Sequence, residues 1–182
     1  MVVGPDTSRP VTPEEYDEVD MLLRAAFPSD AEARLVRQLR RDGDIWAEWV
    51  KPWSGRIAGY AALSRMAEPK GWACLGPVAV WPEWQNGRLL TSDDEAGRKH
   101  WRIGTRLVRE IADTVTLPAT VRDTPETIVV LGEVPFYERC GFSNARAARL
   151  RSPYPLSHTL IARPGTDVPD ARLDYPGAFS RV

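Results

Sequence analysis

Residues 72–80 form the segment that most restricts the fold, because they contain no charged or strongly polar side chain. A strand that is apolar on both faces belongs in the interior of a sheet. Pro82 follows closely and ends the run. Residues 127–131 are a second short apolar run of the same kind. The sequence therefore predicts a sheet with two buried central strands.

Amphipathic helices are predicted before and between these strands. Thr12–Glu15 has a capping hydroxyl, Pro at the first helical position and two acids, and apolar positions continue at helical spacing to Phe27. Ile103 begins another amphipathic pattern. The other elements expected are a helix with Ala33, Val36 and Leu39 on one face, a short helix over 136–140 ending at Gly141, and strands over 45–50, 56–63, 145–150 and 156–162. This order predicts a mixed α/β single domain.

Composition excludes several classes of function. The 182 residues carry a net charge of −1, which does not favour nucleic-acid or membrane-surface binding. Cys74 and Cys140 are the only cysteines, and they form no disulfide framework. The two histidines, His100 and His158, lie in no metal-ligand spacing, so no metal is expected. Neither a signal peptide nor a membrane-spanning run is visible, and the cytoplasm is the expected compartment.

Three short motifs occur in an order that resembles the GNAT family of N-acetyltransferases. The first runs from Leu75 to Gln85, the second from Arg102 to Leu107, and the third from Pro135 to Phe142. The resemblance implies the GNAT fold: a mixed, mostly antiparallel sheet with a central splayed parallel strand pair, flanked by helices. Pieces of similarity cover roughly residues 11–163, and residues 164–182 are expected to be an extension packed on the same domain.

The resemblance also implies how acetyl-CoA binds. Backbone groups of Val78, Ala79 and Val80 would hydrogen-bond the pantetheine arm, much as an added strand binds an open sheet edge. The start of the following helix would hold the pyrophosphate with its amides and dipole. The residues implied there are Lys99, Arg102, Ile103, Gly104 and Thr105.

The phosphate-binding segment departs from the family pattern. Arg102 stands where a glycine is expected and Lys99 where Gln or Arg is usual, and about a dozen inserted residues separate them from Gln85. Residues 85–88 are an alternative start of the motif, with the inserted loop inside it. A solvated basic patch around Lys99, His100 and Arg102 is the alternative to phosphate binding.

Tyr137 is implied to be the general acid that protonates the departing CoA thiolate. The alternative is an aromatic side chain packed beside Phe136 and Phe142. Glu133 is the nearest candidate for the base that the attacking amine needs. Glu32 and Glu48 are further candidates, although the expectation for all three is an exposed carboxylate. Cys140 could carry an acyl group, but it is interpreted as a buried small side chain.

The function predicted is transfer of acetyl from acetyl-CoA to a primary amine by direct attack in a ternary complex. One alternative is a non-catalytic acyl-CoA-binding or regulatory protein derived from such an enzyme, which the altered phosphate segment favours. Another is an interaction module that uses the seven tryptophans. Acetyl-CoA, an unidentified amine and a second copy of the chain are the candidate partners.

Overall fold

The computed structural model describes residues 7–53, 55–87, 102–117 and 123–181. Within them, one sheet has the strand order β1-β2-β3-β4-β5-β6. The strands are β1 (Arg9–Pro10), β2 (Ile45–Trp53), β3 (Arg56–Arg65), β4 (Trp72–Val80), β5 (Thr127–Leu131) and β6 (Thr159–Ala162). Neighbouring strands are antiparallel except β4 and β5, which run parallel. The predicted fold class is confirmed.

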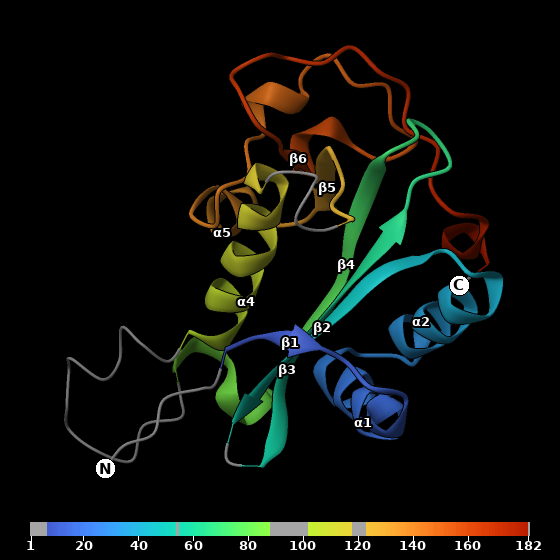
Figure 1. The fold of residues 1–182 in the computed structure, drawn as a ribbon, viewed down its shortest axis with the longest axis vertical. Coiled ribbons are helices and arrows are strands. Elements are labelled where there is room, and N and C mark those ends of the chain that lie inside the picture. The colour runs from blue at the N-terminus through green and yellow to red at the C-terminus, as the bar shows by residue number, and fades with distance from the viewer. Residues whose placement is uncertain (1–6, 54, 88–101, 118–122, 182) are drawn as a thin grey trace.

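Helices cover both faces of the sheet (Figure 1). The helices α1 (Tyr16–Ala26) and α2 (Ala31–Asp42) lie on one face, and α4 (Ile103–Ala112) lies on the other. The short helix α5 (Val134–Glu138) follows β5. The predicted start at Thr12 is a 3-10 turn over Pro13–Glu15, where the Thr12 amide donates to the Glu15 carboxylate at 2.9 Å.

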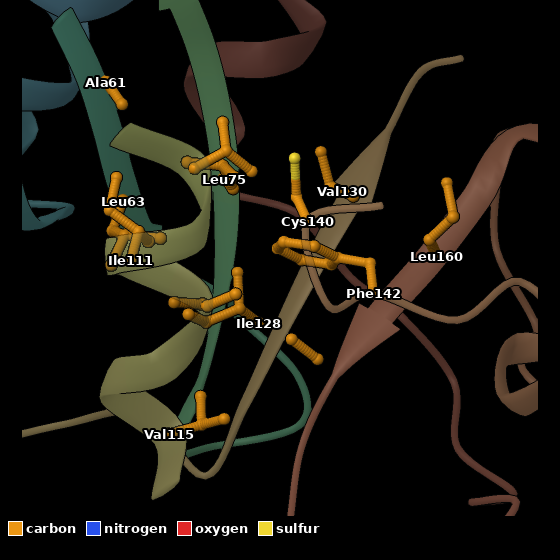
Figure 2. Close-up of a cluster of buried hydrophobic side chains, with 14 of the residues drawn as sticks. Ala61, Leu63, Leu75, Ile111, Val115, Ile128, Val130, Cys140, Phe142 and Leu160 are labelled. Carbon is orange, nitrogen blue, oxygen red and sulfur yellow. The ribbon is translucent and has the colours of Figure 1, made fainter. Parts of the chain in front are cut away.

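The core consists of two apolar layers separated by the sheet. Ala61, Leu63, Leu75, Ile128 and Val130 face α4 and pack with its buried side chains (Figure 2). Residues that alternate with these, such as Tyr60, Ala62 and Ala79, face α1 and α2 instead. Period-two alternation therefore separates the α4 layer from the layer under α1 and α2.

One predicted strand, over residues 145–150, is wrong. The chain forms a 3-10 turn at Ala145–Ala147 there, and the Ala147 amide donates to the Asn144 carbonyl at 2.9 Å. The Asn144 side chain donates to the carbonyls of Leu156 and Thr159, and Arg146 donates to the carbonyl of Arg163. These contacts come from distant residues, so the local apolar pattern did not reveal the turn.

A β-bulge interrupts β4. Leu63 faces Leu75 and Ala61 faces Val78, so two residues of β4, Gly76 and Pro77, oppose one residue of β3. The parallel pairing with β5 covers only Trp72 to Leu75. Because a bulge bends its strand and proline cannot donate to a ladder, β4 leaves β5 at this point while it stays paired with β3.

The C-terminal segment, residues 171–181, packs beside α2 (Figure 1). Asp174 bridges to Glu68, and Arg172 bridges to Arg151. Ala178 is fully buried against Leu35 and Leu39 of α2. The segment therefore covers part of the sheet face that α1 and α2 leave open.

In the described ranges, no helix is long and apolar enough to cross a bilayer.

A buried charged network joins α2 to the sheet. Arg40 donates to both carboxylate oxygens of Glu48, with the shortest contact at 2.6 Å, and the Tyr60 hydroxyl donates to the same carboxylate at 2.6 Å. The Arg40 guanidinium also lies 3.6 Å from the centre of the Tyr16 ring. The Glu48 side chain is only 5% exposed. Its charge therefore depends on Arg40 for compensation.

We expect Arg40→Ala to lower the free energy of unfolding by about 3–5 kcal/mol, because it leaves a buried carboxylate without its cation. Arg24→Ala is the matched control, since it breaks an α1 pair with Asp20 whose arginine is 44% exposed. It should cost less than about 1 kcal/mol. Urea unfolding of both variants measures the difference. Equal losses would contradict the role given to the buried pair.

Candidate active site

A cavity of about 410 Å³ opens where β4 leaves β5. Its walls come from β4, from the turn that follows it, from the start of α4 and from α5. The lining residues are Val78, Val80, Trp84, Gln85, Arg102, Ile103, Gly104, Thr105, Phe136, Tyr137 and Arg139. Seven predicted site residues therefore meet in one cavity, although they are distant in the sequence.

The start of α4 forms one wall of the cavity. Arg102 is the N-cap residue and Ile103 the first helical residue, which agrees with the predicted helix start. A Cβ on Gly104 would lie 3.5 Å from Val80 and 3.9 Å from Phe136, so the helix approaches both β4 and α5 closely. Free amides of a helix's first turn attract anions, and Arg102 adds a positive charge beside them. This wall suits a phosphate group. Lys99, predicted with it, lies outside the described residues.

The edge of β4 forms the second wall. Val78 and Val80 line the cavity, whereas the side chain of Ala79 is buried on the opposite face. The prediction for Ala79 concerned only its backbone, which stays compatible with this placement. The Gln85 side-chain amide donates to the Val80 carbonyl at 3.0 Å. The β4 backbone therefore accepts a hydrogen bond from an amide outside the sheet, as pantetheine binding would require.

Tyr137 reaches the cavity from α5. Its ring meets Phe136 and Phe142 edge to face, with centroid distances of 4.9 and 5.7 Å. Burial is the main cause that raises the pKa of its hydroxyl to about 12, and the nearby Cys140 thiol adds to it. The hydroxyl has no hydrogen-bond partner among the residues that the structure describes. The ring is packed, as the structural interpretation expects, and Tyr137 also lines the cavity, so its role as general acid stays a prediction.

Gly132 positions the Tyr137 ring. A Cβ at this residue would lie 2.4 Å from Cε2 of Tyr137, so only glycine fits beneath the ring. The Gly132 amide donates to the His158 carbonyl of the turn before β6 at 2.9 Å. The Tyr137 amide donates to the Glu133 carbonyl at 3.1 Å, which begins α5. Sequence reasoning missed Gly132, although a glycine directly after a buried strand indicates a close approach.

The three candidate bases occupy different environments. Glu133 is exposed, as expected, and does not line the cavity. Glu48 is buried and paired with Arg40, so the expectation of an exposed carboxylate is wrong for it. The same expectation is wrong for Glu32, which is half-buried on α2. Glu48 is held by Arg40 and Tyr60 and does not line the cavity.

Cys140 has the environment of a structural residue. It is 2% exposed, and burial raises the pKa of its thiol. Its Sγ lies 3.8 Å from the Thr105 carbonyl, where it packs α5 against α4. Buried thiols with raised pKa values are poor nucleophiles. The geometry thus favours the interpretation of Cys140 as a small core side chain.

An aromatic cluster adjoins the cavity through Trp84. The Arg56 guanidinium lies 4.9 Å from the Trp81 ring centre and 5.0 Å from that of Trp84. Trp53 meets Trp84 edge to face at 5.3 Å, and Trp84 lines the cavity. This stack fixes the turn after β4 on the end of the β2–β3 hairpin. Cation–π contacts of this kind cannot be read from sequence spacing.

Comparison with known proteins identifies relatives. No family model matches this chain. It is 30% identical over 147 residues to the uncharacterized N-acetyltransferase YhbS of Escherichia coli K12, covering 79% of this chain and 77% of that one. The crystal structure of the GNAT family N-acetyltransferase YhbS from E. coli in complex with CoA matches with a TM-score of 0.70 and 25% identity, over 100% of this chain and 95% of that one.

A second solved structure has the same fold. It is a GNAT family acetyltransferase from Brucella melitensis in complex with acetyl-CoA. Its TM-score is 0.66 at 23% identity, over 95% of this chain and 97% of that one.

We expect Gly132→Ala to lower the free energy of unfolding by about 1–3 kcal/mol, because the new methyl group displaces the packed Tyr137 ring. Gly104→Ala is the control, since its Cβ would make only ordinary van der Waals contacts within a helix. It should cost no stability. Urea midpoints compare the two variants. Full stability of Gly132→Ala would show that the ring is not held as described.

Proposed function

Because the chain belongs to the GNAT family of N-acetyltransferases, we propose that it transfers acetyl from acetyl-CoA to a primary amine by direct attack in a ternary complex. One observation carries the proposal: β4 leaves β5 beside a cavity that contains both a helix start and Tyr137. A thioester laid along β4 there would have its sulfur within the part of the cavity that α5 closes.

The proposed cofactor site follows from the cavity walls. Arg102, Ile103, Gly104 and Thr105 would hold the pyrophosphate with backbone amides, and the Arg102 charge would add to the helix dipole. The β4 backbone from Val78 to Val80 would hydrogen-bond the pantetheine amides. The Gln85 side chain would give up its hydrogen bond to the Val80 carbonyl so that pantetheine can take its place. The E. coli relative was crystallised with CoA, which supports this class of ligand. Acetyl-CoA supplies the activated acetyl group.

Tyr137 is proposed as the general acid. Its raised pKa, about 12, keeps the hydroxyl protonated at neutral pH, which a proton donor requires. The amine nitrogen forms a bond to the thioester carbon, and the carbon–sulfur bond then breaks. The sulfur takes the Tyr137 proton as it leaves, and Tyr137 regains a proton from the nitrogen. The catalytic role of Glu133 stays a prediction, which Glu133→Gln tests.

Acetyl-CoA should stabilise the fold by about 2.7 kcal/mol at 100 times its Kd, because it binds only the folded state. Arg102→Ala should weaken binding and make it less sensitive to salt, since one cation beside the phosphates is lost. Thermal unfolding and calorimetry at two ionic strengths measure both effects.

Two other outcomes are informative. A melting temperature that does not respond to millimolar acetyl-CoA would refute the proposed function. Tighter binding by Arg102→Ala would identify Arg102 as an obstruction. If Arg102→Ala binds more tightly and the wild type shows no turnover, the alternative of a non-catalytic acyl-CoA-binding or regulatory protein is favoured.

Tyr137→Phe should leave the Kd for acetyl-CoA almost unchanged, because the ground-state thioester needs no proton. Turnover should fall about 10²-fold or more. The loss should be smaller with an acyl donor whose leaving thiol is more acidic, since that thiolate needs less protonation. Thiol release in the presence of an amine measures turnover. If this variant turns over as fast as the wild type, Tyr137 has only a structural role.

A further inference from the structure

We infer that a small polyphosphate binds in a second cavity, between α2 and the C-terminal segment. The cavity is formed by residues on one side of α2 and by Arg181. Its lining is cationic, which selects an anion, and it shares no residue with the cavity beside β4. The inference does not depend on the proposed function and adds a separate binding site to the chain.

The second cavity has a volume of about 290 Å³. Four arginines and one side-chain amide form its lining: Arg34, Arg37, Gln38, Arg41 and Arg181. Among the residues that the structure describes, no carboxylate lines it. Arginine keeps its charge at every physiological pH, so the lining is permanently positive. A hollow lined by charges of one sign concentrates ions of the opposite sign.

Three of these arginines lie on one side of α2. Arg34, Arg37 and Arg41 follow one another by three and four residues, and residues at these spacings are neighbours on a helix. Like charges placed in this way destabilise the helix. The helix dipole favours Arg41 in the last turn, but it does not favour Arg34 near the start. A bound anion would offset the repulsion between them.

Nearby carboxylates compensate Arg34 and Arg37 only in part. Asp30 pairs with Arg34 at 2.9 Å, and Asp20 lies 3.5 Å from Arg37. Arg24 of α1 also contacts both of these aspartates. Three arginines therefore share two carboxylates, and neither carboxylate lines the cavity.

Arg41 and Arg181 are compensated least. The Arg41 guanidinium donates to the neutral Gln38 side chain at 2.9 Å, and no described carboxylate pairs with it. Arg181 is 60% exposed and lies 3.6 Å from Asp42, which also accepts a hydrogen bond from Gln38 at 2.7 Å. Exposed ion pairs of this length contribute little to stability. Both guanidiniums are therefore available to a ligand.

The C-terminal segment brings Arg181 to α2. Its 3-10 turn, Gly177–Ser180, packs beside this helix (Figure 1). Ala178 of the turn is buried against Leu35 and Leu39 of α2. A Cβ on Gly177 would lie 3.2 Å from Nη2 of Arg181, so the Arg181 side chain folds back over the turn. An anion in the cavity would thus bridge two elements that are distant in the sequence.

The chemistry of the lining favours a small molecule with adjacent phosphate groups. A guanidinium presents paired donors that match phosphate oxygens. A phosphate group carries about 1.5 to 2 negative charges at neutral pH, so two adjacent phosphates can bind several arginines at once. The small volume of the cavity favours a compact ligand over a nucleic acid, which the net charge of −1 also disfavours.

Inorganic pyrophosphate is the probe, because it contains two adjacent phosphates and no other group. Calorimetry at constant ionic strength should detect a site that persists both at saturating CoA and in Arg102→Ala, since each of these conditions opposes phosphate binding in the cavity beside β4. Pyrophosphate binding that is absent, or that disappears in Arg102→Ala, would overturn the inference. Failure of the proposed function is distinguishable, because CoA would then not bind, while the pyrophosphate site would persist in Arg102→Ala.

Two variants locate the site. Arg41→Gln and Arg181→Gln should each weaken pyrophosphate binding about tenfold or more, because each removes charge-assisted hydrogen bonds to phosphate. Arg149→Gln is the matched control, since Arg149 is 63% exposed, pairs with Asp170 and does not line the cavity. It should change the Kd by less than about twofold. Equal weakening by all three variants would indicate attraction by overall charge alone and overturn the inference.

Hydrogen exchange tests the bridge to the C-terminal segment. The amides of Phe179 and Arg181 donate to the carbonyls of Pro176 and Ala178, at 3.0 and 3.2 Å. Release of the segment from α2 exposes these amides, so pyrophosphate at 100 times its Kd should slow their exchange by up to about 100-fold. Arg181→Gln should abolish the slowing. Unchanged exchange in the wild type at saturating pyrophosphate would show that the ion does not join the segment to α2, against the inference.

Discussion

The divergence of β4 from β5 is the constraint on which the rest of the site depends. Four residues of parallel pairing hold the two strands together, and the bulge at Gly76 and Pro77 then separates them. Everything assigned to the cofactor lies beyond this point: the exposed edge of β4, the start of α4 and the α5 residue Tyr137. If pairing continued to Val80, β5 would occupy the cavity. It would also take up the backbone hydrogen-bonding groups at the edge of β4.

Both faces of the sheet bury a paired charge. The layer under α4 contains the apolar cluster of Figure 2 and also the fully buried Lys51, whose ammonium pairs with Glu110 of α4 at 2.7 Å. The layer under α1 and α2 buries Glu48, Tyr60 and part of Glu32. Of these, Glu48 is neutralised by Arg40, and this pair anchors the last turns of α2 on β2.

Much of this architecture could be predicted because its signals are local. The apolar run of β4, the Thr12 cap and the amphipathic start at Ile103 each specify an element within a few residues. The cavity could be predicted only through the family resemblance, which brought together Val80, Arg102 and Tyr137. Spacing alone contains no information on which distant segments meet.

The failures have a common physical cause, since each depends on docking between distant elements. The turn at Ala145–Ala147 is fixed by side-chain bonds to carbonyls 12 to 17 residues away. Likewise, a glutamate on a helix has the same local sequence pattern whether that side of the helix is exposed to solvent or packed against the sheet. The burial of Glu32 and Glu48 was therefore invisible until α2 was placed. Gly132 did indicate a close approach, but only the docking of α5 shows that the group that approaches is the Tyr137 ring.

The bulge also determines which residues of β4 face each side of the sheet. Before it, the odd-numbered residues Ala73 and Leu75 face α4, whereas after it the even-numbered residues Val78 and Val80 do. Loss of one residue at Gly76 or Pro77 would keep the composition of β4 almost intact, yet it would exchange the environments of all later side chains. Related chains should thus vary in the residues of β4 far more readily than in its length, and the strand tolerates substitution where it cannot tolerate a single deletion.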